Sequence, residues 1–292
     1  LGTGSAIPTP SRNHNAIIFN YKNKNFLVDC GEGTQRQIRK AKLNMCKITD
    51  ILITHMHGDH IFGLPGLLHT MSKTGYNREL MIYCPKGAGK KMKQFLDLTG
   101  VHGIDYKIKE VRGKFIDNPY FSISSLALDH DVTCNGYMFE EKDRLRIDKK
   151  KLSKYNIKGK EVGKLIRKKN VKINGKLIKY KDLTFLEKGR KISFVFDTKY
   201  CSNVDKLIKN SDLAIMEGVF LGSTSVGKEM SKRYKHLTLE ESAKAGKKGK
   251  VKELIISHIS QRYEFKEKFL LKEAKKIYKN VKIASDLMKV TI

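Results

Sequence analysis

Short apolar runs recur along the chain, and many of them end in a polar residue that can take part in chemistry. The runs and the polar residues that follow them are 26–28 before Asp29, 51–53 before His55, 123–128 before Asp129 and His130, 192–196 before Asp197, 213–216 before Glu217, and 254–256 before His258. Runs of this length, bounded by turn residues, are typical of buried strands and predict a core of two sheets. Because functional groups at strand ends commonly converge on one cleft, we expect these side chains to meet.

Helical periodicity is predicted for residues 34–42, 64–73, 86–98, 204–209, 239–245 and 266–279. In the last segment, Phe269, Leu270, Ala274 and Ile277 form an apolar stripe with lysines on the opposite face. Thr238, followed three residues later by Glu241, is typical of a capping box, so His236 should lie just before the start of a helix.

The densest cluster of metal-binding residue types follows the run at 51–53. His55, His57, Asp59 and His60 fall within six residues. In an extended segment His55 and His57 project to the same side, and Gly58 permits a sharp turn before a helix that begins near Asp59. Imidazole nitrogen and carboxylate oxygen suit zinc, manganese or non-haem iron. This segment therefore predicts ligands to two metal ions, and the alternative of a surface histidine cluster without function is disfavoured.

The composition excludes several classes of protein. The chain has 292 residues, enough for one large domain or two ordinary ones, and 40% of them are hydrophobic. No apolar run approaches the roughly 18–20 residues that cross a bilayer, and no secretory signal is visible, so we expect a cytoplasmic protein without a membrane span. The five cysteines are far apart and form no CxxC pair, which argues against a disulfide framework. No Walker-type loop or dinucleotide signature appears, so no nucleotide cofactor is expected.

The charge balance indicates a polyanionic partner. Fifty-nine lysines and arginines against thirty acidic residues leave a formal charge of +29, with a pI near 9.8. Nucleic acid is the first candidate partner and an anionic membrane surface the second, while a generally basic proteome is the alternative explanation.

Much of this charge lies in one segment. Residues 149–181 contain fourteen lysines or arginines and one acidic residue, Glu161. The segment also has apolar residues, namely Tyr155, Ile157, Val162, Leu165, Ile166 and Ile173. We therefore predict a protruding insertion with a small apolar centre that grips phosphates independently of base sequence. A solvated basic linker is the alternative.

The residues at 55–60 resemble the H-x-H-x-D-H signature of the metallo-β-lactamase superfamily. Seven further segments are similar to the ribonuclease Z family, and together they span essentially the whole chain: 1–13, 29–35, 63–68, 83–87, 136–137, 236–238 and 257–263. The resemblance implies an α/β fold, a four-layer αβ/βα sandwich. It implies one domain over 1–292, in the short form of the family, with a flexible tRNA-binding arm inserted at 145–190.

The resemblance also implies a zinc-dependent endoribonuclease and a ligand set for two Zn²⁺ ions. Its metal ligands would be His55, His57 and His130 for one ion, Asp59, His60 and His258 for the other, and Asp197 as the bridge. Asp59 would also orient or deprotonate the nucleophile, while His236 and Glu217 would manage the proton delivered to the leaving oxygen. Manganese or iron also fits these ligands.

The implied substrate is precursor tRNA, cleaved after the discriminator nucleotide to leave a tRNA 3′-hydroxyl and a trailer 5′-phosphate. The resemblance places a loop with Arg12 and Asn13 by the RNA 3′ end and suggests a homodimer. For the arm, the expected contacts with tRNA come from Lys158, Lys160, Lys164, Arg167, Lys168 and Lys169. Recognition of a folded RNA by shape and phosphate suits such an arm.

Two alternatives stay open: another hydrolase of this fold that acts on small esters, and an RNA-binding protein with an idle metal site. The chain also departs from the family pattern. It has Lys158-Gly159-Lys160 where bacterial members commonly have a Gly-Pro pair, and Phe196 before Asp197 where members usually have glycine. Met216 stands before Glu217 where many members carry histidine. None of these departures removes an expected ligand.

Overall fold

A computed structural model describes residues 1–155, 157, 159–173 and 175–292 of the chain. It divides into two compact units. The first comprises residues 1–117, 122–139 and 191–292, and the second comprises residues 118–121 and 140–190. All the strand-end residues singled out above belong to the first unit.

The first unit contains a five-stranded sheet in the order β1-β2-β3-β4-β5. Its strands are β1 (Ile17–Tyr21), β2 (Lys24–Val28), β3 (Asp50–Leu52), β4 (Leu80–Pro85) and β5 (Tyr106–Val111). The first pair is antiparallel, and β2 to β5 run parallel to one another. The carboxyl ends of these four strands therefore lie at one edge of the sheet.

A second sheet has the order β16-β15-β14-β13-β8-β7-β6. Its strands are β6 (Gly113–Asp117), β7 (Phe121–Leu128), β8 (Cys134–Glu141), β13 (Lys191–Val195), β14 (Leu213–Glu217), β15 (Glu253–Ser257) and β16 (Val281–Ile283). The last four strands are mutually parallel, while β6 and β7 are antiparallel.

The two sheets pack face to face through aromatic side chains. Phe19 and Phe26 of the first sheet stack with ring centroids 4.7 Å apart, and Phe19 also lies 5.5 Å from Phe139 and 5.3 Å from Phe194 of the second sheet. Stacked and edge-on aromatic pairs at such distances stabilise the packing beyond what the burial of their apolar area contributes.

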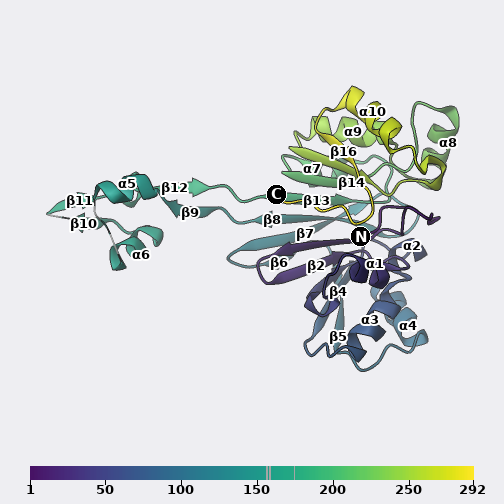
Figure 1. Cartoon of the computed structure of the whole chain (residues 1–292), viewed down its shortest axis with the longest axis horizontal. Coiled ribbons are helices and arrows are strands. Elements are labelled where there is room, and N and C mark those ends of the chain that lie inside the picture. Colours follow the sequence, from purple (N-terminus) through teal and green to yellow (C-terminus); the bar gives the residue numbers. More distant parts are fainter. Residues whose placement is uncertain (156, 158, 174) are drawn as a thin grey trace. The chain divides into compact units, whose positions relative to one another are not determined.

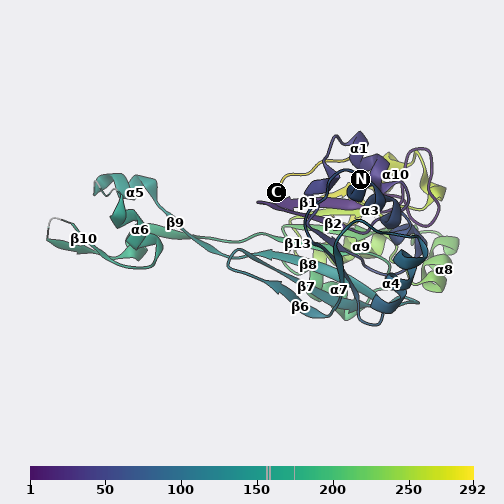
Figure 2. The same ribbon diagram turned by 90° about the horizontal axis from the view of Figure 1, so that it is seen from below.

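Helices cover the outer face of each sheet (Figure 1, and from below in Figure 2). On the first sheet, α1 (Thr34–Lys40), α3 (Leu64–Lys73) and α4 (Gly89–Leu98) bury their apolar residues against the strands. On the second, α7 (Ser202–Ile208), α9 (Leu239–Lys248) and α10 (Glu267–Ile277) do the same. The predicted four-layer arrangement is confirmed.

The six predicted helices are all present, with ends shifted by a few residues. The capping box at the start of α9 is also confirmed: the Thr238 hydroxyl accepts from the Glu241 amide, and the Glu241 carboxylate accepts from the Thr238 amide. Helix α8 (Ser225–Tyr234) was not predicted. It is mostly polar and buries only Gly227 and Ser231; its apolar residues Val226, Met230 and Tyr234 recur every four positions, but Val226 and Tyr234 are exposed. The short helical turns are α2 (Gly58–Ile61), η1 (Met45–Lys47) and η3 (Gln261–Tyr263).

The second unit has a small core of its own; we call residues 140–190 the basic unit. It contains β9 (Arg144–Ile147), α5 (Lys149–Lys154), α6 (Lys160–Ile166), β10 (Val171–Ile173), β11 (Lys176–Ile178), η2 (Tyr180–Asp182) and β12 (Thr184–Glu187). Strands β9 and β12 pair antiparallel, as do β10 and β11. The expected apolar centre exists around Ile157, Leu165 and Val171, whereas Tyr155 and Ile166 are exposed.

Two expectations from composition can be compared with the structure. All five cysteines are free thiols, as predicted. Among the described residues, no helix combines the length and the apolar character needed to cross a membrane.

Candidate metal centre

The strand-end residues converge because parallel strands end at the same edge of a sheet. Asp197 follows β13, Glu217 ends β14, and His258 follows β15. In the other sheet, Asp29 follows β2 and His55 lies just past β3. Since the two sheets pack face to face, both sets of strand ends meet, as the sequence predicted.

Three of these residues adopt the left-handed backbone conformation. Asp29, Asp197 and His258 have φ values of 55°, 49° and 55°. A non-glycine residue in this region is strained by about 1–3 kcal/mol, and such residues cluster at functional sites. The bulky Phe196 before Asp197, noted as a departure, is accommodated because its side chain is fully buried in the interior.

One group of donor atoms is formed by His55, His57, His130 and Asp197. His55 Nε2 lies 3.0 Å from His57 Nδ1, which in turn lies 3.3 Å from His130 Nε2. The Asp197 Oδ2 atom is 3.5 Å from His55 Nε2 and 3.9 Å from His130 Nε2. The spacing of the first two histidines confirms that they project to the same side.

A second group is formed by Asp59, His60, His258 and the other oxygen of Asp197. His60 Nε2 and His258 Nε2 are 3.1 Å apart, and they lie 3.4 Å and 3.3 Å from Asp59 Oδ2. The Asp197 Oδ1 atom lies 3.5 Å from His60 Nε2 and 3.4 Å from His258 Nε2. Asp197 therefore offers one oxygen to each group, the position expected of a bridging ligand.

The spacing of these atoms fits divalent cations. Ligand atoms about 2.0–2.1 Å from a tetrahedral zinc ion lie about 3.3 Å from one another, close to the nitrogen–nitrogen distances of the two groups. Among the described residues, the buried Asp197 Oδ1 also finds no hydrogen-bond donor, which is costly unless another partner is present. The donor set thus suits a pair of metal ions, and the ligand roles themselves stay predictions.

Burial and neighbouring charges set the protonation of the histidines. Burial lowers the pKa of His55 well below its ordinary value, and the nearby His60 lowers it further. Burial also lowers the pKa of His130. At His60, burial acts in the same sense, but the carboxylates of Asp197, Asp29 and Asp59 outweigh it and raise the pKa well above its ordinary value. In the metal-free protein the neighbouring carboxylates thus favour protonated His60, whereas burial favours neutral imidazoles at His55 and His130.

Asp29 holds His60 from behind, a role that the sequence analysis did not assign. Asp29 Oδ2 lies 2.7 Å from His60 Nδ1, and the carboxylate accepts hydrogen bonds from the Thr54 amide at 2.8 Å and from Asn15 Nδ2 at 3.1 Å. Such a contact fixes the proton on Nδ1 and directs Nε2 toward a metal. The available signal was its place at a strand end, which it shares with the predicted ligands.

Lys235 holds His130 and was also missed. Its carbonyl oxygen lies 3.3 Å from His130 Nδ1, and its ammonium group donates to Asp129 at 3.1 Å and to the His130 carbonyl at 3.2 Å. Lys235 has a left-handed backbone with φ 53° and immediately precedes His236. A contact through a backbone carbonyl leaves no trace in residue type, so sequence gave no signal for it.

The predicted pair of His236 and Glu217 is in hydrogen-bond contact. His236 Nδ1 lies 2.8 Å from Glu217 Oε2, and the other oxygen of Glu217 accepts the Thr198 amide at 2.7 Å. Burial alone would lower the pKa of His236, but the buried Glu217 carboxylate outweighs it and raises the pKa to about 9. His236 Nδ1 is also 3.9 Å from Asp197 Oδ2, so the pair borders the candidate metal centre.

Comparison with known proteins shows relatives along the whole chain. The chain is 37% identical over 266 residues to Ribonuclease Z of Nanoarchaeum equitans, covering 90% of this chain and 83% of the relative. It is 38% identical to Ribonuclease Z of Listeria monocytogenes, covering 98% of this chain and 96% of the relative. The chain belongs to the ribonuclease Z family.

Solved structures agree with this membership. Human tRNase Z, short form, superposes with a TM-score of 0.69 at 25% identity and covers 100% of this chain and 97% of the human chain. YhfI of Bacillus subtilis, described as a metallo-beta-lactamase fold protein, has the same TM-score at 19% identity and covers 98% of this chain and 94% of its own. The predicted metallo-β-lactamase fold is thereby confirmed.

A second family overlaps the ribonuclease Z family in the N-terminal half. A family profile described as Anti-Pycsar protein Apyc1 matches residues 1–155, so this half of the chain belongs to that family as well. The matched part contains the 55–60 motif and His130 but ends before Asp197, Glu217, His236 and His258.

The predicted substrate-binding residues lie in different settings. Arg12 is only 2% exposed, and its guanidinium donates to Thr3, to the Ala284 carbonyl and to Glu267. A buried guanidinium with these partners serves the interior, so its position does not favour the contact with RNA predicted for it. Asn13 is half-buried and donates to the Glu32 carbonyl.

Five of the six residues of the basic unit that were predicted to contact tRNA lie in the described part of the chain. Lys158 lies outside the described residues. The others are exposed: Lys160, Lys164, Arg167, Lys168 and Lys169. Their contact with RNA stays a prediction.

A pocket of about 410 Å³ opens on the candidate metal centre. On one side it is lined by His57, Asp59, His130, Asp197, His236 and His258, and its apolar lining includes Ile7, Val219, Phe220, Met230 and Tyr234. The size is within the range of small-ligand sites.

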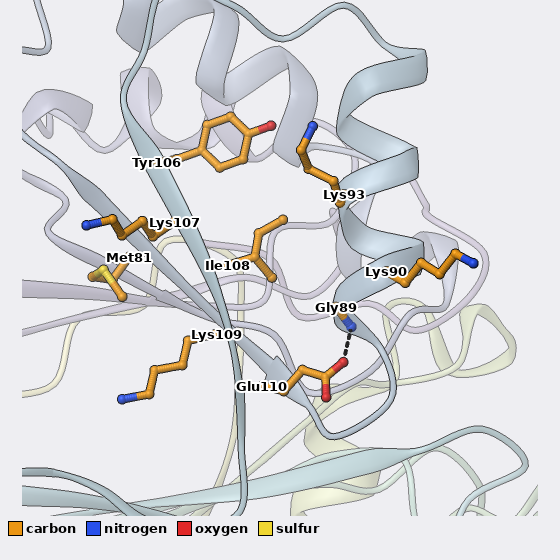
Figure 3. A pocket seen from close by; sticks show the side chains of 9 residues that line it. All are labelled: Met81, Gly89, Lys90, Lys93, Tyr106, Lys107, Ile108, Lys109 and Glu110. Carbon is orange, nitrogen blue, oxygen red and sulfur yellow. Dashed lines mark hydrogen bonds between the residues drawn. The ribbon is translucent and has the colours of Figure 1, made fainter.

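A larger hollow of about 650 Å³ lies between α4 and the edge strand β5 (Figure 3). It is lined by Lys90, Lys93, Lys107 and Lys109, and its Glu110 accepts a hydrogen bond from the Gly89 amide. It contains none of the strand-end residues, so the metal centre, not this hollow, is the candidate catalytic site.

Proposed function

We propose that this chain is a metal-dependent endoribonuclease that removes the 3′ trailer from precursor tRNA. It would cut after the discriminator nucleotide and leave a tRNA 3′-hydroxyl and a trailer 5′-phosphate. The observation that carries the proposal is the meeting of two donor groups and the His236–Glu217 pair around Asp197, next to one pocket. The names of relatives 32–38% identical over nearly the whole chain, and of human tRNase Z, support the substrate.

The cofactors in this proposal are two Zn²⁺ ions per chain, with Mn²⁺ or Fe²⁺ as substitutes that the same donors accept. One ion would be held by His55, His57 and His130, the other by Asp59, His60 and His258, and Asp197 would serve both as the bridge. When bound, a pair of such ions lowers the pKa of the attacking water and offsets the negative charge that accumulates on the phosphoryl oxygens.

The chain's own residues handle the protons. The nearby imidazoles, His60 foremost, outweigh burial and lower the pKa of Asp59, so this carboxylate is ionised at neutral pH and ready to orient the attacking water or accept its proton. On the other side, the pKa of His236 near 9 keeps it protonated. As the bond between phosphorus and the 3′-oxygen breaks, His236 donates its proton to that oxygen, and Glu217 holds the imidazolium in place.

We propose that residues 145–190 form the arm that binds tRNA away from the cut. The support is the local excess of positive charge and the exposure of the residues expected to contact phosphate, such as Lys164 and Arg167. Contacts with phosphate provide affinity without reading bases. The expected homodimer belongs to the same proposal.

A second candidate is a hydrolase of the same fold that acts on small phosphodiesters or other esters. The match of residues 1–155 to the Apyc1 profile favours keeping it, because that half contains the 55–60 motif. The formal charge of +29 argues against a small neutral substrate. The two candidates differ in whether a folded RNA is cut at one site.

The test is incubation of the purified protein with a 3′-extended precursor tRNA, with and without a chelator, followed by mapping of both product ends. We expect one cut after the discriminator nucleotide, abolished by the chelator and by Asp197→Ala. Turnover of a chromogenic diester with intact precursor would favour the second candidate. Tight binding of precursor without release of a trailer, in metal-loaded protein, would instead indicate an RNA-binding protein with an idle site.

A further inference from the structure

One side of the pocket at the metal centre is apolar, and the metal chemistry does not use it. Phe220, Met230 and Tyr234 line this side together with Ile7 and Val219; we call Phe220, Met230 and Tyr234 the aromatic wall. Tyr234 is the last residue of α8 and is 45% exposed. With its apolar neighbours in the lining, this partly exposed ring forms a surface suited to the apolar part of a ligand.

Contacts within the protein hold the wall in place. The Phe220 ring lies 6.0 Å from the His236 ring at an interplanar angle of 66°, and the Arg262 guanidinium lies 5.9 Å from the Phe220 ring. The Arg233 guanidinium lies 5.4 Å from the Tyr234 ring. The wall therefore adjoins the proton donor, and its rings are already ordered by neighbouring groups.

The pocket thus joins two kinds of surface that match the two parts of a nucleotide. Carboxylates and imidazoles lie where a phosphate would meet the cations, and a nucleobase has the flat apolar faces that aromatic side chains stack against. A volume of about 410 Å³ accommodates a small ligand of nucleotide size.

The position of the proton donor decides which nucleotide this is. In the proposed reaction, on which this inference rests, the bond that breaks joins phosphorus to the 3′-oxygen of the discriminator nucleotide. His236 gives its proton to that oxygen, so the ribose that carries the oxygen must lie beside His236. The aromatic wall provides the apolar surface beside His236 through Phe220, whose ring lies 6.0 Å from the imidazole.

We propose that the aromatic wall binds the base of the discriminator nucleotide, with Tyr234 as the stacking residue. Stacking uses the face of the base and not its hydrogen-bonding edge, so the wall accepts any of the four bases. It orients the nucleoside whose 3′-oxygen leaves, without reading its identity.

The test combines two changes, one in the protein and one in the RNA. Wild type, Tyr234→Ala and Tyr234→Phe are compared on a precursor with a normal discriminator nucleotide and on one that lacks only its base. Tyr200→Ala is the matched control, because Tyr200 is similarly exposed, has Lys248 over its ring at 5.6 Å and does not line the pocket.

On the normal precursor we expect Tyr234→Ala to lower kcat/KM by about 5- to 150-fold, the range for loss of one base–aromatic stack. Tyr234→Phe and Tyr200→Ala should stay near wild type. Wild type should lose a similar factor on the abasic precursor, and Tyr234→Ala should lose little more there, because the stack is already absent.

Two results would overturn the inference and leave the proposed function intact. One is that removing the Tyr234 ring and the discriminator base together lowers kcat/KM by the full product of the two separate losses. The other is a Tyr234→Ala variant that cuts as well as Tyr200→Ala. Failure of the wild type to cut the normal precursor would overturn both. Thermal unfolding of each variant separates a binding defect from a folding defect.

Discussion

Replacing Asp29 by asparagine changes one buried atom behind His60 and preserves the shape of the side chain. The Asp29 carboxylate accepts hydrogen bonds on both oxygens, from the Thr54 amide and from His60 Nδ1. Asparagine has only one acceptor oxygen. If that oxygen keeps the Thr54 amide, the new NH₂ group faces His60 Nδ1 and the imidazole must carry its proton on Nε2.

The consequence follows from the direction of that nitrogen. His60 Nε2 points at His258 Nε2, 3.1 Å away, in the second donor group. A protonated Nε2 cannot bind a metal ion, so Asp29→Asn weakens this half of the centre. Loss of such a supporting contact typically lowers metal affinity 10- to 100-fold, or about 1.4–2.8 kcal/mol. The unfolding free energy of the metal-free protein should also fall by about 1–3 kcal/mol, because a buried donor loses its acceptor.

The assay is competition between the protein and a zinc chelator at neutral pH, with the stoichiometry followed as the second ion is lost. Asp50→Asn is the matched control: Asp50 is a buried carboxylate of the same sheet that pairs with Lys24 and lies outside the donor groups. We expect Asp29→Asn to retain one ion tightly and release the other more readily than Asp50→Asn does. Equal retention of both ions by the two variants would refute the role assigned to Asp29.

Three further predictions concern protons and charge. His236→Ala should slow cleavage of precursor tRNA about 10²–10⁴-fold in single turnover. In the same test, Glu217→Gln should move the alkaline limb of the pH–rate profile to lower pH, because Glu217 raises the pKa of His236 to about 9. An alkaline limb that does not move would contradict the pairing of the two residues. His60 and His236 have pKa values in the folded protein that are above the ordinary 6.5. Their contribution to the stability of the metal-free protein is therefore complete below pH 6.5 and is lost as the pH rises through the folded pKa values. The unfolding temperature should fall toward alkaline pH, and an unfolding temperature that rises with pH would contradict this. Combined alanine substitution of Arg167, Lys168 and Lys169 should weaken tRNA binding and reduce the slope of log affinity against log salt concentration by about 0.7–0.9 per lost phosphate contact. The control is the same change at three exposed lysines outside the basic unit, Lys272, Lys275 and Lys279, which should have a smaller effect. Equal effects of the two triple variants would count against the arm.

The sequence predicted that strand-end residues such as Asp197, Glu217 and His258 converge, because functional groups at the ends of strands commonly lie in one cleft. In the structure they meet because β13, β14 and β15 run parallel and end at one edge of the sheet. The alternation of side chains along a strand likewise placed His55 beside His57. These predictions needed only the positions of the apolar runs and the alternation of side chains along an extended segment.

Other features depend on partners that no local pattern reveals. Arg12 was expected to meet RNA because the family resemblance places its loop by the RNA 3′ end, yet its partner Glu267 stands 255 positions away in sequence. No helix was predicted over α8, so Met230 and Tyr234, which are four positions apart, were not expected to line the pocket together. At Gly58, a sharp turn was the predicted reason for glycine, but its φ is not positive; instead, a Cβ there would meet the Phe62 ring at 2.3 Å.

The backbone at the metal centre shows why its residues cannot be exchanged for the types that the conformation prefers. Asp29, Asp197 and His258 occupy left-handed positions where glycine would relieve about 1–3 kcal/mol of strain each. Each nevertheless provides a side chain that the centre uses: Asp29 supports His60, Asp197 faces both donor groups, and His258 belongs to the second group. The strain is tolerated because these side chains are buried among opposite charges and donor atoms that bind them in one arrangement. Glycine at any of the three positions would relieve the strain but remove a side chain that the centre uses.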